Sequence, residues 1–139
     1  MKKGYYITES GEKVILESNK RIIVSWKNIV ELIIPDGVKQ VYCSDNNLTE
    51  LILPDRVKWV YCYKNNLTEL IIPDGVEMVN CSNNNLTELI IPDGVEVVSC
   101  NNNQLSKLIL PDSIERVNCD AGILDLEKYK NKNINIEIF

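Results

Sequence analysis

The sequence contains no histidine at all. This absence removes the side chain that most often acts as a general base and most often binds metal ions. The chain also lacks a G-x-S-x-G nucleophile motif, a C-x-x-C pair for zinc and a D-x-D-x-D-G calcium loop. We therefore expect no catalytic site, no cofactor and no metal site.

Basic residues and long apolar runs are scarce as well. Fifteen Lys and Arg against twenty Asp and Glu give a formal charge of -5, which argues against binding to nucleic acid or to an anionic membrane. No run approaches the roughly eighteen apolar residues of a membrane span. Because Met1 to Tyr6 lack the apolar stretch of a secretory signal, we expect an intracellular, cytoplasmic protein.

A fixed repeat dominates what is present. Cysteines recur every nineteen residues, and prolines keep the same period. The cysteines are Cys43, Cys62, Cys81, Cys100 and Cys119, and the prolines are Pro35, Pro54, Pro73, Pro92 and Pro111. Such a period, held through most of a chain that is 45% hydrophobic, is typical of a solenoid of stacked turns rather than of a globule with one enclosed core.

One unit predicts a strand followed by two corners. Val41 and Cys43 alternate with Tyr42, so the first two point inward and the tyrosine points outward. Asn46 lies where the chain turns, and apolar residues then return to the interior. Pro54 marks a second corner, because proline has no backbone donor for a sheet ladder.

The unit V-x-x-V-x-C-x-x-N-x-L resembles the leucine-rich repeat motif L-x-x-L-x-L-x-x-N-x-L, with valine or cysteine replacing leucine. The resemblance implies a right-handed solenoid with a parallel sheet on its concave side. Nineteen residues leave no room for a convex helix, so extended or polyproline-like backbone is expected there. The repeats of this chain look similar to the short, helix-free leucine-rich repeats of bacterial effectors and of giant-virus proteins. Relatives of this type can be joined to a ubiquitin ligase domain, so a substrate-recruiting role is one alternative.

The repeats and the chain ends predict a single mainly β domain over residues 1–139. Residues 1–18 would form an N-terminal cap, with a hairpin between Tyr5 and Leu16. Residues 19–122 hold about six repeats. Residues 123–139 would form a C-terminal cap, with a short helical turn near Leu126 and a last strand ending at Phe139.

Residues at the same position of successive repeats should stack in columns, and two of these columns are expected to have a structural role. We interpret the five cysteines as reduced, buried packing residues, because a straight row of sulfurs does not form a tetrahedral zinc site. An asparagine at each turn can satisfy backbone groups of its own and the neighbouring turn. These asparagines are Asn46, Asn65, Asn84 and Asn103.

Carboxylates also form columns. One contains Glu31, Glu50, Glu69 and Glu88, and another contains Asp36, Asp55, Asp74, Asp93 and Asp112. Like charges this close together repel and could attract a cation such as calcium. We favour a simpler interpretation, in which the corner aspartates cap backbone N–H groups.

The outward side of the strands is where the units stop resembling one another. The expected partner-binding residues are Gln40, Tyr42, Trp59, Tyr61, Tyr63 and Met78. Aromatic side chains are enriched in interfaces because they bury a large area at a low entropy cost. The alternative is that these tyrosines only stack across strands and stabilise the sheet. The leading hypothesis is a non-catalytic module that binds another protein.

A stripe of isoleucines follows each asparagine turn, at Ile52, Ile71 and Ile90. Each lies between two apolar neighbours, and an extended segment can bury only alternate side chains. The stripe would then face outward and could join two copies as a homodimer. A rotation of the corner could equally turn it inward, and the sequence leaves both possibilities open.

Overall fold

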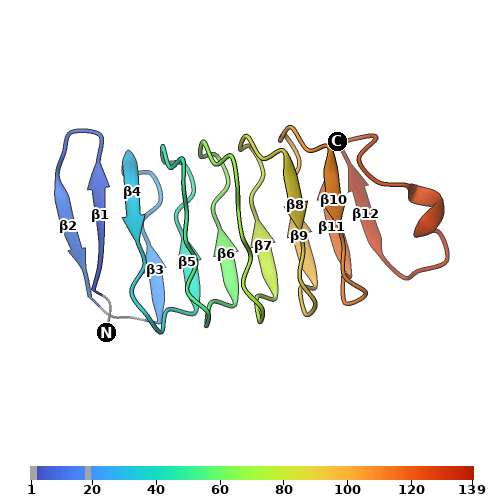
Figure 1. Cartoon of the computed structure of the whole chain (residues 1–139), viewed down its shortest axis with the longest axis horizontal. Helices are drawn as coiled ribbons and strands as arrows, with labels where there is room; N and C mark the ends of the chain where they lie inside the picture. The colour runs from blue at the N-terminus through green and yellow to red at the C-terminus, as the bar shows by residue number, and fades with distance from the viewer. Residues whose placement is uncertain (1–2, 18–19) are drawn as a thin grey trace.

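The computed structural model describes residues 3–17 and 20–139 and shows a solenoid of stacked turns (Figure 1). Each turn contributes one strand to a parallel sheet with the order β12-β11-β9-β7-β6-β5-β3. These strands are β3 (Arg21–Ile23), β5 (Gln40–Tyr42), β6 (Trp59–Tyr61), β7 (Met78–Asn80), β9 (Val97–Ser99), β11 (Arg116–Cys119) and β12 (Asn135–Ile138). The predicted mainly β solenoid with a parallel sheet is confirmed.

The register repeats the sequence period. Val41 pairs with Val60, which pairs with Val79, so each strand lies level with the strand nineteen residues later. Identical positions therefore stack in columns along the solenoid. The sequence alone thus identifies which side chains are neighbours between turns.

The other side of each turn, here called the return side, consists of residues 29–33, 49–53, 68–72, 87–91 and 106–110. It contains short strands at β4 (Ile29–Ile33), β8 (Glu88–Ile90) and β10 (Lys107–Ile109), while 49–53 and 68–72 are irregular. None of the residues described by the structure forms an α-helix. This agrees with the expectation that a nineteen-residue turn is too short for one.

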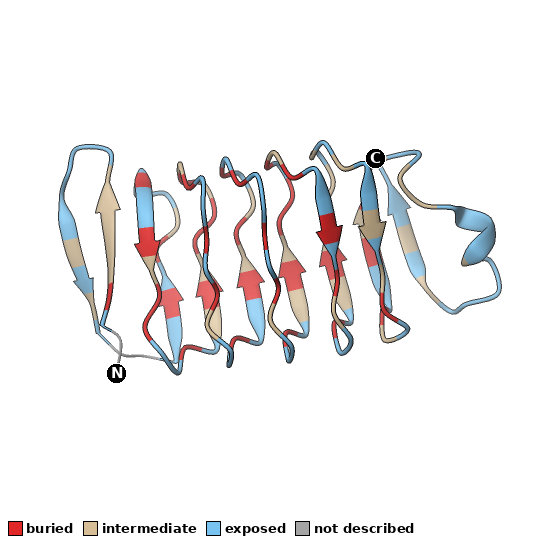
Figure 2. Ribbon diagram, viewed as in Figure 1, coloured by how far each residue is buried: buried red, intermediate tan, exposed pale blue. Residues whose placement is uncertain are grey.

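The core lies between the two sides, and Figure 2 marks its buried residues in red along the stacked turns. Each central turn adds the same set of buried residues, as Val76, Val79, Cys81, Leu86 and Leu89 do in one turn. These side chains come from both the sheet and the return side. Burial of this apolar column stabilises the stack, because no single turn could enclose its own hydrophobic side chains.

The N-terminal hairpin joins β1 (Gly4–Thr8) to β2 (Lys13–Leu16) and extends the return side. Strand β1 pairs antiparallel with β4, so the hairpin is held by the first turn. Gly4 makes this contact possible, since a Cβ atom there would collide with the ring of Pro35 and the carbonyl of Ile33. The expected boundary between cap and repeats, at residues 18–19, lies outside the described residues.

At the other end, the chain leaves the repeat and forms the 3-10 helix η1 (Leu126–Lys128). It then returns as β12, which pairs in parallel with β11. The last predicted strand is therefore present and completes this edge of the sheet.

Three of the five corner aspartates do not act as predicted. In the described part of the chain, the carboxylates of Asp55, Asp74 and Asp93 accept no hydrogen bond from a backbone N–H group. The corner is closed instead by the backbone, as when the N–H of Val57 donates to the carbonyl of Pro54 at 3.2 Å. For these three aspartates the capping interpretation was wrong, because this turn already provides its own acceptor.

Candidate functional site: the aromatic patch on the sheet

The expected binding residues lie together on the solvent side of the seven-stranded sheet, over β5, β6 and β7, where Trp59 is exposed and the others are half-buried. We call it the aromatic patch and define it as Gln40, Tyr42, Trp59, Tyr61, Tyr63 and Met78. The rings of Tyr42 and Tyr61 stack with centroids 4.9 Å apart and planes inclined by 5°. The pairing of the two strands places them level with one another. Parallel strands thus fix these two rings in advance of any binding.

Trp59 and Met78 form the adjoining row of the patch. Trp59 lies between Gln40 and Met78 in the register and keeps 38% of its surface exposed. The Tyr61 hydroxyl contacts the Met78 sulfur at 2.9 Å. Partial burial, and next the neighbouring Tyr42, raise the pKa of Tyr61, so this ring stays neutral at physiological pH.

The polar edge of the patch is formed by the turn after the strands. The ammonium group of Lys64 lies 3.6 Å from the carboxylate of Asp45 in the preceding turn. Next to them, the hydroxyl of Ser44 is buried and has no hydrogen-bond partner in the described structure. Tyr63 is half-buried in the same region.

Farther along the solenoid, the same columns become polar and are linked by side-chain hydrogen bonds. The Ser82 hydroxyl donates to Asn101 at 2.8 Å, and the Asn118 amide donates to Ser99 at 3.1 Å. The patch is therefore an aromatic region beside a polar one whose side chains are partly hydrogen-bonded to each other, since the buried amide oxygen of Asn118 has no partner among the described residues.

Two residues at the N-terminal end adjoin this surface. Ile23 pairs with Tyr42 and is 62% exposed, and it was missed as a site residue although its position in the repeat places it in the tyrosine column. Trp26 is 74% exposed and has a positive φ of 58°. Its equivalents Asp45 and Lys64 share that backbone conformation, so the repeat imposes it on tryptophan.

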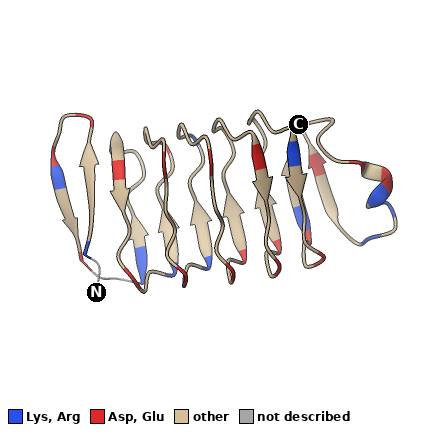
Figure 3. Cartoon of the chain, viewed as in Figure 1, with Lys and Arg blue, Asp and Glu red and all other residues tan. Residues whose placement is uncertain are grey.

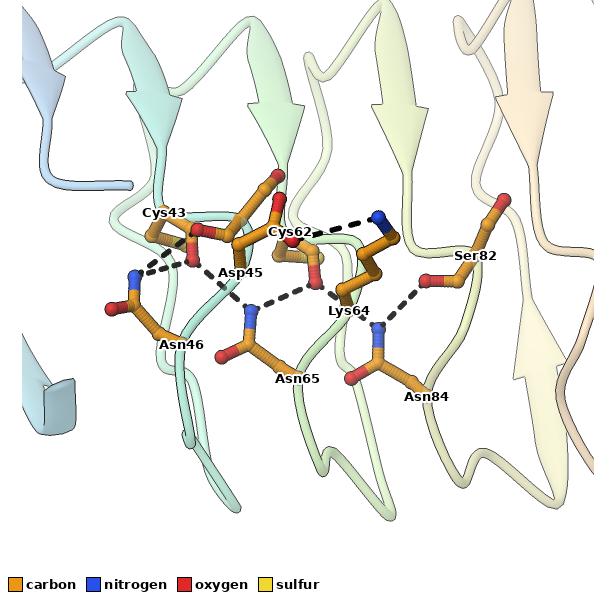
Figure 4. Close-up of polar contacts among 9 residues, drawn as sticks. Cys43, Asp45, Asn46, Cys62, Lys64, Asn65, Ser82 and Asn84 are labelled. Atoms are coloured by element: carbon orange, nitrogen blue, oxygen red, sulfur yellow. Dashed lines mark hydrogen bonds and ion pairs between the residues drawn. The ribbon is translucent and has the colours of Figure 1, made fainter. Parts of the chain in front are cut away.

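The asparagine column forms a continuous hydrogen-bonded ladder (Figure 4). The amide of Asn84 donates to the carbonyls of Cys62 at 3.1 Å and Cys81 at 3.0 Å, while its oxygen accepts from the N–H of Leu67 at 3.0 Å. Asn65 makes the same three bonds one turn earlier. Each asparagine thus joins two turns and satisfies backbone groups that are shielded from water.

The ladder begins at Asn46 and ends at Asn103. Asn46 accepts from the N–H groups of both Lys27 and Ile29, because the first turn has one more donor to satisfy. Beyond Asn103 the next position is Gly122, which cannot continue the pattern. The carboxylate of Asp120 closes the ladder by accepting from the N–H of Asn102 at 2.8 Å.

All five cysteines are free thiols in the buried interior. Burial raises the pKa of Cys43 to about 12, and it raises the pKa values of Cys62 and Cys81 well above the usual value. A protonated, enclosed thiol is neither a nucleophile nor a metal ligand. In the part of the chain that the structure describes, no group of three acidic or cysteine side chains could hold a metal ion.

The isoleucine stripe lies outside the core on the return side. Ile52, Ile71 and Ile90 are 61%, 74% and 54% exposed. Of the two possibilities left open by the sequence, the structure places these side chains outward.

No helix among the described residues is both long and apolar enough to cross a membrane.

Comparisons with known proteins support the fold. No protein-family model matches the chain, and no curated protein matches its sequence. Among solved structures, a leucine-rich repeat (LRR) domain of a Shigella effector has a similar fold, with a TM-score of 0.53 and 14% sequence identity. The match covers 87% of this chain and 81% of that domain. The fold therefore defines an LRR-like solenoid, the class of architecture that the repeat motif indicated.

Proposed function

We propose that this chain is a non-catalytic protein-interaction module that binds a partner protein through the aromatic patch. The observation that carries the proposal is the preformed stack of Tyr42 and Tyr61 beside the exposed Trp59. Rings that are already ordered lose little conformational entropy when a partner covers them, and buried aromatic side chains dominate binding energy in interfaces.

The scaffold supports the same proposal. The buried columns repeat from turn to turn, whereas the exposed columns change from aromatic to polar. A regular core beneath a variable surface is typical of repeat proteins that present an extended binding face. Five buried thiols without a disulfide also suit a reducing, intracellular compartment.

The experiment is a pull-down from cell extract followed by titration calorimetry with the captured protein. We expect Trp59→Ala and Tyr63→Ala each to weaken binding by about thirtyfold, the effect of losing one hot-spot residue. Asn101→Ala and Asn118→Ala, on the polar part of the same face, serve as matched controls and should change the affinity by less than about threefold. Equal capture by the aromatic variants and the wild type would exclude the patch as the binding site.

A further inference from the structure

Two segments of the return side lie unpaired between strands. In segments 49–53 and 68–72, the backbone N–H and C=O groups have no hydrogen-bond partner among the described residues. The equivalent segments of the next two turns do pair, as β8 with β10. The geometry of the repeat thus permits pairing on this side, and something specific to the earlier turns prevents it.

The charges at one position of the repeat explain the difference (Figure 3). In the paired turns, Glu88 lies opposite Lys107. In the earlier turns the same position holds Glu31, Glu50 and Glu69, so each neighbouring pair is acid against acid. Opposite charges across two strands stabilise their pairing, and like charges directly opposite destabilise it.

A groove lies where pairing fails. It has a volume of about 580 Å³ and runs between residues 49–55 and 68–73. Leu51, Ile52 and Ile71 contribute apolar surface, and Glu50, Asp55 and Glu69 are the charged residues that line it. A second groove of about 330 Å³ continues on the other side of Ile52, against β4. Ligand pockets in proteins usually have volumes of roughly 300–1,000 Å³, so the first groove is large enough for several residues of a peptide.

We propose that this groove binds an extended segment of a partner protein in which basic and aliphatic side chains alternate. Unpaired backbone groups on the groove walls offer hydrogen bonds of the kind made when a peptide adds a strand to a sheet. Aliphatic side chains of the peptide cover Ile52 and Ile71, and its basic side chains neutralise Glu50 and Glu69. The site lies opposite the aromatic patch and does not depend on it.

The acidic lining selects this occupant over a second copy of the chain. A symmetric contact between two return sides would bring the same glutamate columns against each other, around the same isoleucines. Like-charge contacts of this kind oppose association. A basic peptide instead places positive charge against these glutamates.

Fluorescence anisotropy with labelled synthetic peptides tests the proposal. The probe is an alternating lysine–valine peptide of about six residues, the usual length of a strand. We expect it to bind the intact protein about tenfold more tightly than its glutamate–valine counterpart. N-methylation of alternate peptide nitrogens should weaken binding about tenfold, because it removes the donors needed for strand pairing.

Charge-reversed variants locate the site. The Glu50→Lys, Glu69→Lys double variant keeps like charges across the groove, and its preference should reverse to the glutamate peptide. Glu96→Lys with Glu115→Lys makes the same change in net charge away from the groove and should retain the wild-type preference. Equal effects of the two double variants, or no loss on N-methylation, would overturn the proposal. A dimer abolished by Ile71→Lys in light scattering would also overturn it, since the occupant would then be a second copy.

Discussion

The rings of Tyr42 and Tyr61 lie nearly parallel at a centroid distance of 4.9 Å, on adjacent strands joined in register. This arrangement combines two roles that the sequence could not separate. Cross-strand aromatic pairs of this kind stabilise sheets, and under the proposed function the same two rings would contact the partner. The first role can be measured without knowing what the protein binds.

A double-mutant cycle measures the stack directly. We expect Tyr42→Ala and Tyr61→Ala to show a coupling free energy of about 1 kcal/mol in urea unfolding, the usual value for an aromatic pair. The matched pair Asn80→Ala and Asn118→Ala, from non-adjacent strands of the same column, should be additive. A coupling near zero for the tyrosines would show that the stack does not stabilise the sheet.

The asparagine ladder predicts a large loss of stability from one small change. Asn65→Ala removes three hydrogen bonds and leaves the carbonyls of Cys43 and Cys62 and the N–H of Leu48 without that partner. We expect the free energy of unfolding to fall by about 3 kcal/mol, because three buried hydrogen bonds are lost and the N–H of Leu48 is left unpaired, while the two carbonyls keep their bonds from Asn46 and Asn84. Asn66→Ala, at the exposed neighbouring position, should change it by less than about 0.5 kcal/mol. Similar losses in both variants would contradict the ladder's structural role.

The cysteine column predicts instability at alkaline pH. Burial raises the pKa of Cys43 to about 12, so the folded state keeps a proton that the unfolded state loses above about pH 9. The unfolded state then binds fewer protons, and stability falls as the pH rises from about 9 to 12. Each fully buried thiol contributes a slope of about 1.4 kcal/mol per pH unit within that window.

Urea unfolding at several alkaline pH values checks whether stability falls as the pH rises and whether the buried thiols cause the fall. Cys62→Ala with Cys81→Ala should show a visibly shallower decline than the wild type, since two protected thiols are gone. All other titratable groups are the same in both proteins, so their effects cancel in the comparison. An unchanged slope would mean that the thiols are not responsible.

The charge pattern of the return side predicts a stabilising substitution. Glu69→Lys places a base between Glu50 and Glu88, which reproduces on both sides the pairing of Glu88 with Lys107. We expect a gain of about 0.5–1 kcal/mol in unfolding free energy, together with slower amide exchange in residues 68–72. Glu96→Lys changes the net charge equally and should not protect those amides. Faster exchange in Glu69→Lys would contradict the account of why these turns stay unpaired.

The corner glycines predict position-specific strain. Gly75 has a φ of +92°, which disfavours any residue with a Cβ atom. Gly75→Ala should therefore lower the unfolding free energy by about 1 kcal/mol. Arg56 occupies the equivalent position one turn earlier without a positive φ, so Arg56→Ala is the matched control. Thermal unfolding of both variants distinguishes backbone strain from a general effect of this corner.

Several features of the fold could be derived from the sequence because they follow from local periodicity. The spacing of Cys43 and Cys62 fixed the length of a turn, and alternation around Val41 indicated which side chains face inward. The recurrence of Asn46 and Asn65 indicated a ladder between turns. These inferences require only that equivalent positions of successive repeats stack on one another, as they do in repeat proteins.

The candidate site was less accessible from sequence. The tyrosine column was visible, yet the stacking geometry of Tyr42 and Tyr61 depends on the twist and spacing of the strands. Ile23 was missed because it precedes the clearest repeats. The capping prediction failed at Asp55, Asp74 and Asp93 because the same residue types are found in turns closed by a side chain and in turns closed by the backbone.

The sequence by itself determined the period, the buried columns and the absence of histidine chemistry, since each depends on residue type and spacing alone. Only the tertiary structure decided which turns pair on the return side, how the hairpin docks on β4 and where the isoleucine stripe points. Those features depend on contacts between turns, where Glu50 meets Glu69 in one place and Glu88 meets Lys107 in another. The balance of such contacts becomes defined only when the turns are stacked in register.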